Sequence, residues 1–164
     1  MGKLSVYDLN SRENWKRMLD ETQSSLGLPT ALLDPDNIIL QSKGKRNQLC
    51  WEIRSRNKTK SVICGQSQQF MANMARAQKS FVVEICEAGM AKFVVPILQD
   101  ENYLGCVTAC GCMLPGTQVE AYLIEKTTDI DEQIISEMAE TAPVIRREQL
   151  QQLAEDLFGR LNAS

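Results

Sequence analysis

The chain has 164 residues, of which 43% are hydrophobic and 24% charged, and its formal net charge is −3 at pH 7, so we expect one ordinary globular domain over residues 1–164. It contains no histidine, which excludes Ser-His-Asp and Cys-His catalysis and the zinc-binding H-E-x-x-H helix, and we therefore expect no enzyme. Neither an apolar signal-peptide core nor a run of about 18 apolar residues is present, which predicts a cytoplasmic protein without a membrane span.

The first predicted element is an amphipathic helix that ends at Gly27 and Pro29. Asn10 and Glu13 have the three-residue spacing of a capping box, which predicts that the helix begins directly after Asn10. The residues of its buried face recur at helical spacing, at Trp15, Met18, Leu19, Thr22 and Leu26.

Residues 30–42, "TALLDPDNIILQS", predict a β-hairpin, because two apolar runs flank a turn sequence in which proline fixes φ. Two helices are predicted next, over residues 46–57 and 65–78, with the polar segment 58–64 between them. From residue 80 the spacing of the apolar residues changes from that of helices to that of β-strands. Three β-rich runs are joined by short connections suited to antiparallel hairpins, at residues 80–86, 90–98 and 103–112. A loop over 114–122 and helices over 129–142 and 146–161 complete the chain.

This order predicts an α+β fold: a PAS-like five-stranded antiparallel sheet with a helical crossover and flanking N- and C-terminal helices. In such a fold, one face of the sheet and the crossover enclose a small-molecule pocket. The run 103–112 is rich in small apolar residues, so we expect it in the middle of the sheet, covered by neighbours on both edges.

The six cysteines are the most unusual feature of the sequence. Without a secretion signal they are expected to be free thiols, and their spacing matches neither zinc knuckles nor a ferredoxin motif. Because strand side chains alternate, we expect Cys106, Cys110 and Cys112 to lie on one face. Each cysteine also has a simpler interpretation as a small buried residue of the core.

The basic residues are concentrated in segment 43–60, which carries a net charge of +6 and leaves −9 for the rest of the chain. They are Lys43, Lys45, Arg46, Arg54, Arg56, Lys58 and Lys60, against Glu52. We interpret this segment as a solvated basic face. The overall negative charge and the lack of interleaved aromatic residues argue against direct contact with nucleic acid.

Several short motifs resemble the PocR sensory domain of prokaryotic histidine kinases and transcription regulators. They are "GLPTALLDPDNIIL", Cys64 ahead of an alanine-bearing helix, "CEAGM" from Cys86, "VVPIL" and "YLGCVTACG". The resemblance implies a PAS-like fold that senses a simple, hydrocarbon-like metabolite for a downstream kinase or regulator domain. Two positions depart from the family pattern: Glu87 stands where a histidine is usual, and Cys112 where a glutamine is usual.

The sequence is compatible with three hypotheses about function. The first is a sensory module that holds a small molecule in a pocket lined by cysteines, namely Cys50, Cys64, Cys86, Cys106, Cys110 and Cys112. The second is a sensor that binds zinc or an iron–sulfur cluster through thiolates, and its expected ligands are Cys64, Cys86, Cys110 and Cys112. A helix N-terminus at Cys64 would favour its thiolate. The third is a thiol enzyme with Glu84 or Glu87 as base.

The C-terminal helix, residues 145–162, has a stripe of leucines at positions 150, 153, 157 and 161. This stripe has two interpretations: it packs on the domain's own sheet, or it forms a homodimer and transmits the sensor's state.

Overall fold

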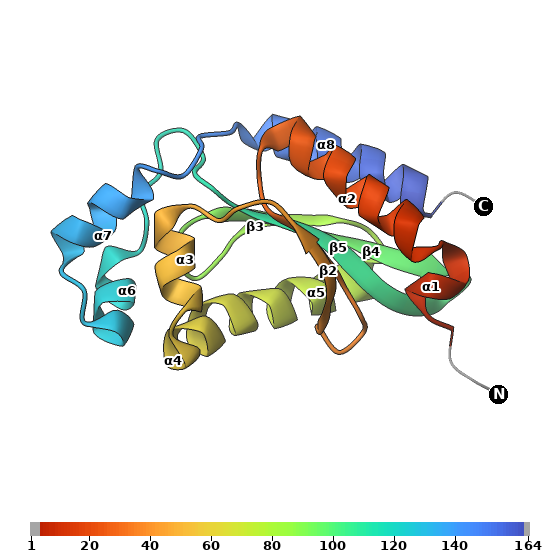
Figure 1. The fold of residues 1–164 in the computed structure, drawn as a ribbon, viewed down its shortest axis with the longest axis horizontal. Coiled ribbons are helices and arrows are strands. Elements are labelled where there is room, and N and C mark those ends of the chain that lie inside the picture. Colours follow the sequence, from red (N-terminus) through yellow and green to blue (C-terminus); the bar gives the residue numbers. More distant parts are fainter. Residues whose placement is uncertain (1–3, 163–164) are drawn as a thin grey trace.

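The computed structural model describes residues 4–162 and contains a five-stranded antiparallel sheet in the order β2-β1-β5-β4-β3 (Figure 1). The strands are β1 (Thr30–Leu33), β2 (Ile39–Lys43), β3 (Val82–Ile85), β4 (Ala91–Gln99) and β5 (Asn102–Cys112). The predicted α+β, PAS-like fold is confirmed, and β5 is the central strand as expected.

The N-terminal helix was predicted correctly except for its start. Helix α2 (Arg12–Leu26) is capped by Ser11, whose hydroxyl accepts a hydrogen bond from the Asn14 amide, and not by Asn10. Gly27 ends it in the left-handed conformation that glycine favours. A short helix α1 (Val6–Leu9), which was not predicted, precedes it.

The crossover between β2 and β3 is more continuously helical than the sequence predicted. It consists of α3 (Gln48–Arg54), α4 (Asn57–Thr59), the π-helix η1 (Lys60–Gly65) and α5 (Gln66–Gln78). The break expected at residues 58–64 is therefore wrong. Its physical reason is tertiary packing: Ile63 is buried, and the buried Thr59 hydroxyl donates to the Thr127 carbonyl at 3.0 Å.

Three helices follow the sheet: α6 (Ala121–Thr128), α7 (Glu132–Ala139) and α8 (Arg147–Leu161). Helix α6 was missed, and its N-cap residue Glu120 makes no side-chain capping bond that could have marked the start. Helix α8 buries Leu150, Ala154 and Leu157 against the sheet. The leucine stripe therefore packs on the domain's own sheet, the first of its two interpretations.

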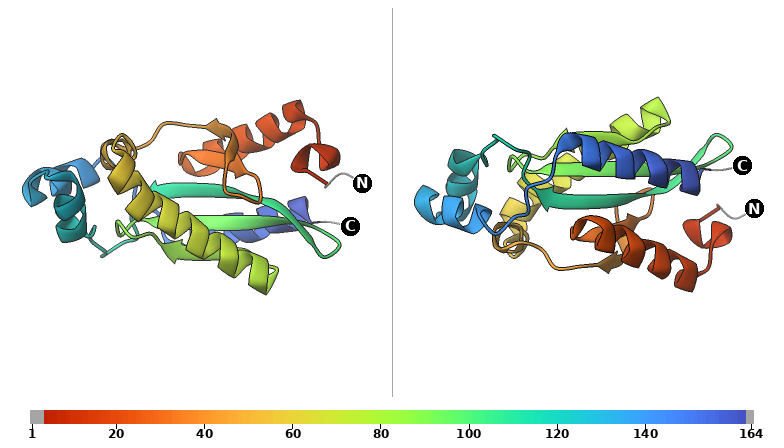
Figure 2. Two further views of the ribbon diagram at one scale, coloured as in Figure 1. Left: turned by 90° about the horizontal axis from the view of Figure 1, so that it is seen from below. Right: turned by 90° about the horizontal axis from the view of Figure 1, so that it is seen from above.

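The helices divide between the two faces of the sheet. Helices α2 and α8 cover one face, and α5 lies across the other (Figure 2). A separate apolar cluster, around Ile53, Ile63 and Ile124, joins α3, η1, α6 and α7 at one end of the sheet. Within residues 4–162, no helix has both the length and the apolar character that a membrane span requires.

Candidate functional site

Strand β5 contains a bulge at Gly111 that changes which way the following side chain faces. Opposite it on β4, Ala91 pairs with Cys112 and Lys92 with Cys110, so Gly111 has no partner, and its φ is 100°. Directly paired residues of an antiparallel ladder share one face of the sheet. Cys110 therefore lies with Lys92 on the α5 face, and Cys112 lies with Ala91 on the face covered by α2 and α8.

The expectation that three cysteines share a face is thus wrong for Cys112. Its side chain is 0% exposed in the apolar cluster that includes Val107 and Ala109, and burial raises its pKa to about 12. Cys106 does face α5, where it packs with Leu33. Burial also raises the pKa of Cys106, so both thiols are neutral core groups at physiological pH.

The α5 face of the sheet and the helical crossover enclose a cavity of about 490 Å³. Its wall includes two of the cysteines, Cys64 from η1 and Cys110 from β5. The buried polar residues in its wall include Gln68 from α5, Lys92 from β4 and Thr108 from β5. Buried polar groups that face a cavity are typical of a site that holds a polar ligand.

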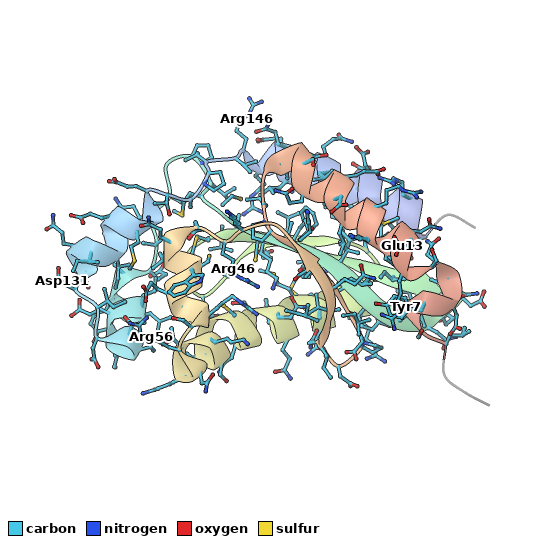
Figure 3. All side chains as sticks on the ribbon, viewed as in Figure 1. Tyr7, Glu13, Arg46, Arg56, Asp131 and Arg146 are labelled. Carbon is cyan, nitrogen blue, oxygen red and sulfur yellow. The ribbon has the colours of Figure 1, made fainter. Side chains whose placement is uncertain are left out.

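The charged residues of the cavity wall are all basic. Five cationic residues line it and no Asp or Glu does: Lys43, Arg46, Arg54, Lys60 and Lys92. Four of them belong to the basic segment that we had interpreted as a solvated face, and Arg46 lies on the connection from β2 to α3 (Figure 3). Among the residues described, only Lys43 of these five pairs with a carboxylate, that of Asp20 at 3.7 Å.

The two cavity cysteines, Cys64 and Cys110, have two further thiols as neighbours: Cys50 from α3 and Cys86 from the turn between β3 and β4. Burial raises the pKa of Cys50, and the neighbouring Cys110 and Cys86 thiols raise it further. Burial likewise raises the pKa of Cys86. Four such groups cannot all ionise in a site of low dielectric without a compensating positive charge.

Cys64 does not have the environment that the sequence suggested. It lies within η1, in a helical run that continues from α4 into α5, and therefore not at a helix N-terminus. Burial raises its pKa, and the nearby Arg54 guanidinium only partly offsets this effect. The expected depression of its pKa by a helix end is wrong, because no free backbone amides point at its sulfur.

Asn47, which sequence reasoning missed, connects α3 to the bulge. Its side-chain oxygen accepts from the Cys50 amide at 2.8 Å, which caps α3. Its Nδ2 donates to the Gly111 carbonyl at 2.9 Å and lies 3.4 Å from Cys50 Sγ. The Cys50 thiol in turn lies 3.7 Å from Met90 Sδ. These contacts hold Cys50 beside β5.

Lys92 and Gln68 were also missed. The signal for Lys92 was a lone lysine in the run "MAKFVVPIL", since a continuous apolar run predicts a strand buried on both faces, which would bury the lysine as well. No sequence signal marked Gln68, because glutamines are common on exposed helix faces.

Among residues 4–162, no three Cys, Asp or Glu side chains are arranged to hold one metal ion. Of the expected ligands, Cys64, Cys86 and Cys110 lie on the cavity side, whereas Cys112 lies on the opposite face. Binding of a metal ion or an iron–sulfur cluster by the thiols stays a prediction.

One of the comparisons with known proteins identifies a family. The sensory domain found in PocR matches residues 8–163. A crystal structure from Vibrio cholerae, described as the C-terminal domain of a transcriptional regulator, is 10% identical, with a TM-score of 0.36 over 83% of this chain and 99% of that one. None of the curated proteins matches. The match over residues 8–163 shows that the chain belongs to the PocR family of sensory domains.

Proposed function

We propose that this domain senses a small molecule held in the cavity between the sheet and the helical crossover, with Cys64 and Cys110 in its wall. The observation that carries the proposal is the presence of three buried polar side chains, Gln68, Lys92 and Thr108, in the wall of a cavity of about 490 Å³. Burying such groups is unfavourable unless a partner satisfies them. A bound ligand would supply that partner.

Protection of thiols from alkylation tests this proposal. A ligand in the cavity should slow the reaction of Cys64 and Cys110 with a thiol reagent, whereas Cys106 and Cys112 should react slowly with or without it. Native mass spectrometry of protein purified without denaturation would report the bound mass. The proposal would be contradicted by two results together: the purified protein carries no bound mass, and no fraction of a cell extract slows the alkylation of Cys64 or Cys110.

A matched pair of variants separates the cavity from the rest of the surface. Ser61 is exposed at the cavity wall, and Ser136 is exposed on α7 away from it. Ser61→Trp should obstruct the cavity and abolish protection, while Ser136→Trp should leave it unchanged.

The second candidate is a cluster sensor in which thiolates bind iron and sulfide. The observation that favours it is that Cys50, Cys64 and Cys110, from three separate elements, lie near one another and near Cys86 in the turn after β3. An iron–sulfur cluster fits better than one zinc ion, because cysteines around a cluster are spaced more widely than those around a single ion. In this proposal Cys50 replaces Cys112, which the bulge turns to the other face.

Iron and sulfide analysis of anaerobically purified protein, together with its visible absorption, tests the second candidate. Cys50→Ser and Cys110→Ser should each abolish the bound iron. Cys112→Ser and Cys106→Ser should retain it and cost mainly stability, because both residues are buried in apolar clusters. Folded, iron-free protein that does not change on anaerobic addition of iron and sulfide would exclude this candidate.

In either case we propose a signalling role and no catalysis, with output to a downstream kinase or regulator domain. The cavity and the terminal helices α2 and α8 lie on opposite faces of the same sheet. A change in the strands on ligand binding would therefore reach α8 directly. Homodimerisation is part of this proposal, and it would use surfaces other than the buried stripe of α8.

A further inference from the structure

Lys92 is a buried cation without a counter-charge. Its side chain is 8% exposed and lines the cavity. Glu84 lies opposite it in the ladder of β3 and β4, yet within residues 4–162 neither Glu84 nor any other carboxylate lies within 4.0 Å of the Lys92 ammonium nitrogen. A buried ammonium group is unfavourable unless it is paired, so a negative charge is expected to enter the cavity and approach it.

Gln68 supplies an unused hydrogen-bond acceptor in the same wall. Its side chain is 7% exposed, and its Nε2 donates to Asn37 Oδ1 at 3.1 Å and lies 3.5 Å from Cys106 Sγ. Its Oε1 is buried and receives no hydrogen bond. A buried acceptor of this kind is usually satisfied, which here requires a donor on the ligand.

We propose that the ligand is a small carboxylate that also carries a hydroxyl group, bound with its carboxylate on Lys92 and its hydroxyl donating to Gln68 Oε1. This inference rests on the proposed sensory function and assigns its ligand class. Three further cations of the wall that form no ion pair within residues 4–162, Arg46, Arg54 and Lys60, add to the positive potential, and no acidic residue lines the cavity to oppose it. A neutral ligand would leave Lys92 unpaired.

The test compares acids with their neutral analogues. Thermal unfolding of the wild type is measured with lactate or glycerate, and with propane-1,2-diol or glycerol at the same concentration, and alkylation of Cys64 and Cys110 is followed in parallel. We expect the hydroxy acids to raise the unfolding temperature and protect both thiols, and the neutral alcohols to do neither. Propionate, which lacks the hydroxyl of lactate, should bind more weakly.

Two lysine variants complete the test. Lys92→Met keeps the length of the side chain and should weaken binding of the hydroxy acid roughly tenfold or more, the loss expected for a charged hydrogen bond. Lys58→Met, on the exposed α4 and outside the cavity, should not. Protection by the alcohols but not by the acids would overturn the anion assignment and leave the sensory function intact. Equal binding of hydroxy acid by Lys92→Met and wild type would overturn it as well, as would absence of any effect of the acids.

Discussion

Lys92 on β4 and Cys110 on β5 lie directly opposite each other in the ladder, and the next residue of β5, Gly111, has no partner. The pair places a cation and a thiol side by side on the cavity wall. In a regular strand Cys112, two residues further on, would share the face of Cys110. The bulge at Gly111 instead turns Cys112 to the opposite face. The bulge at Gly111 therefore decides that Cys110, and not Cys112, lies in the cavity wall.

Gly111→Ala should destabilise the domain by about 1–3 kcal/mol. Its φ of 100° disfavours any side chain, and an added Cβ would lie 3.2 Å from Asn47 Nδ2 and 3.6 Å from Cys50 Sγ. Gly116→Ala is the matched control, because its φ of 78° is also positive but nothing lies within 4 Å of an added Cβ. Denaturant unfolding measures both changes, and equal losses would show that the contacts at the bulge contribute nothing.

Cys112→Ser should cost about 1–3 kcal/mol of stability, because the serine hydroxyl would be buried among apolar side chains. Cys112→Ala removes the sulfur without adding a polar group and should be less harmful if the hydroxyl is the cause. Urea titrations of the two variants compare these costs. A serine variant as stable as the wild type would contradict the position of Cys112 in the core.

The raised pKa of Cys112 gives a pH dependence of definite sign. In the unfolded chain this thiol ionises near its ordinary value of 9.0, whereas in the folded protein it stays protonated until about pH 12. Its contribution to stability is therefore present below pH 9 and is lost as the pH rises from 9 to 12.

Comparison with Cys112→Ala isolates this contribution from other groups that titrate in alkali. The free energy of unfolding of the wild type should fall more steeply above pH 9 than that of the variant. Parallel curves for the two proteins would indicate that Cys112 is accessible to solvent.

Leu157→Ala should destabilise the domain by about 2–5 kcal/mol, since Leu157 is 2% exposed between α8 and the sheet. Replacing it with a polar residue therefore cannot test dimerisation, because the fold itself would be lost. Light scattering of the unmodified protein over a range of concentrations is the suitable measurement. A change in mass for Leu157→Ala without loss of stability would place this leucine at an interface between two chains.

The sheet was predictable because each strand carries a local signal. Alternation or continuous apolar runs marked the strands, and the Asp34–Asn37 turn marked the hairpin. The bulge was not predictable, since strict alternation assumes an unbroken ladder and the glycine at 111 is also compatible with a regular strand. The assignment of Cys112 failed for this reason.

The cavity was predictable in outline and not in its charge. The fold class implies a space between sheet and crossover, but whether Arg54 and Lys60 face solvent or the cavity depends on how the crossover packs on the sheet. The composition of segment 43–60 gives its net charge but does not show which way its side chains point. Helix α6 was missed because its start lacks a side-chain cap and because its polar residues are also typical of a loop.

The π-helix η1 has a consequence for the length of the crossover. A π-turn contains one residue more than the α-helical turn it replaces, so deletion of a single residue from segment 60–65 would restore a regular α-helix. Because the wide turn takes up the extra residue, the helical segments on either side of it would keep their relative rotation after this deletion. A deletion within the regular helix α5 would instead rotate the side chains that follow it by about 100°, the angle per residue of an α-helix. The turn over residues 60–65 is thus a place where the crossover can change in length while Gln68 stays in the cavity wall.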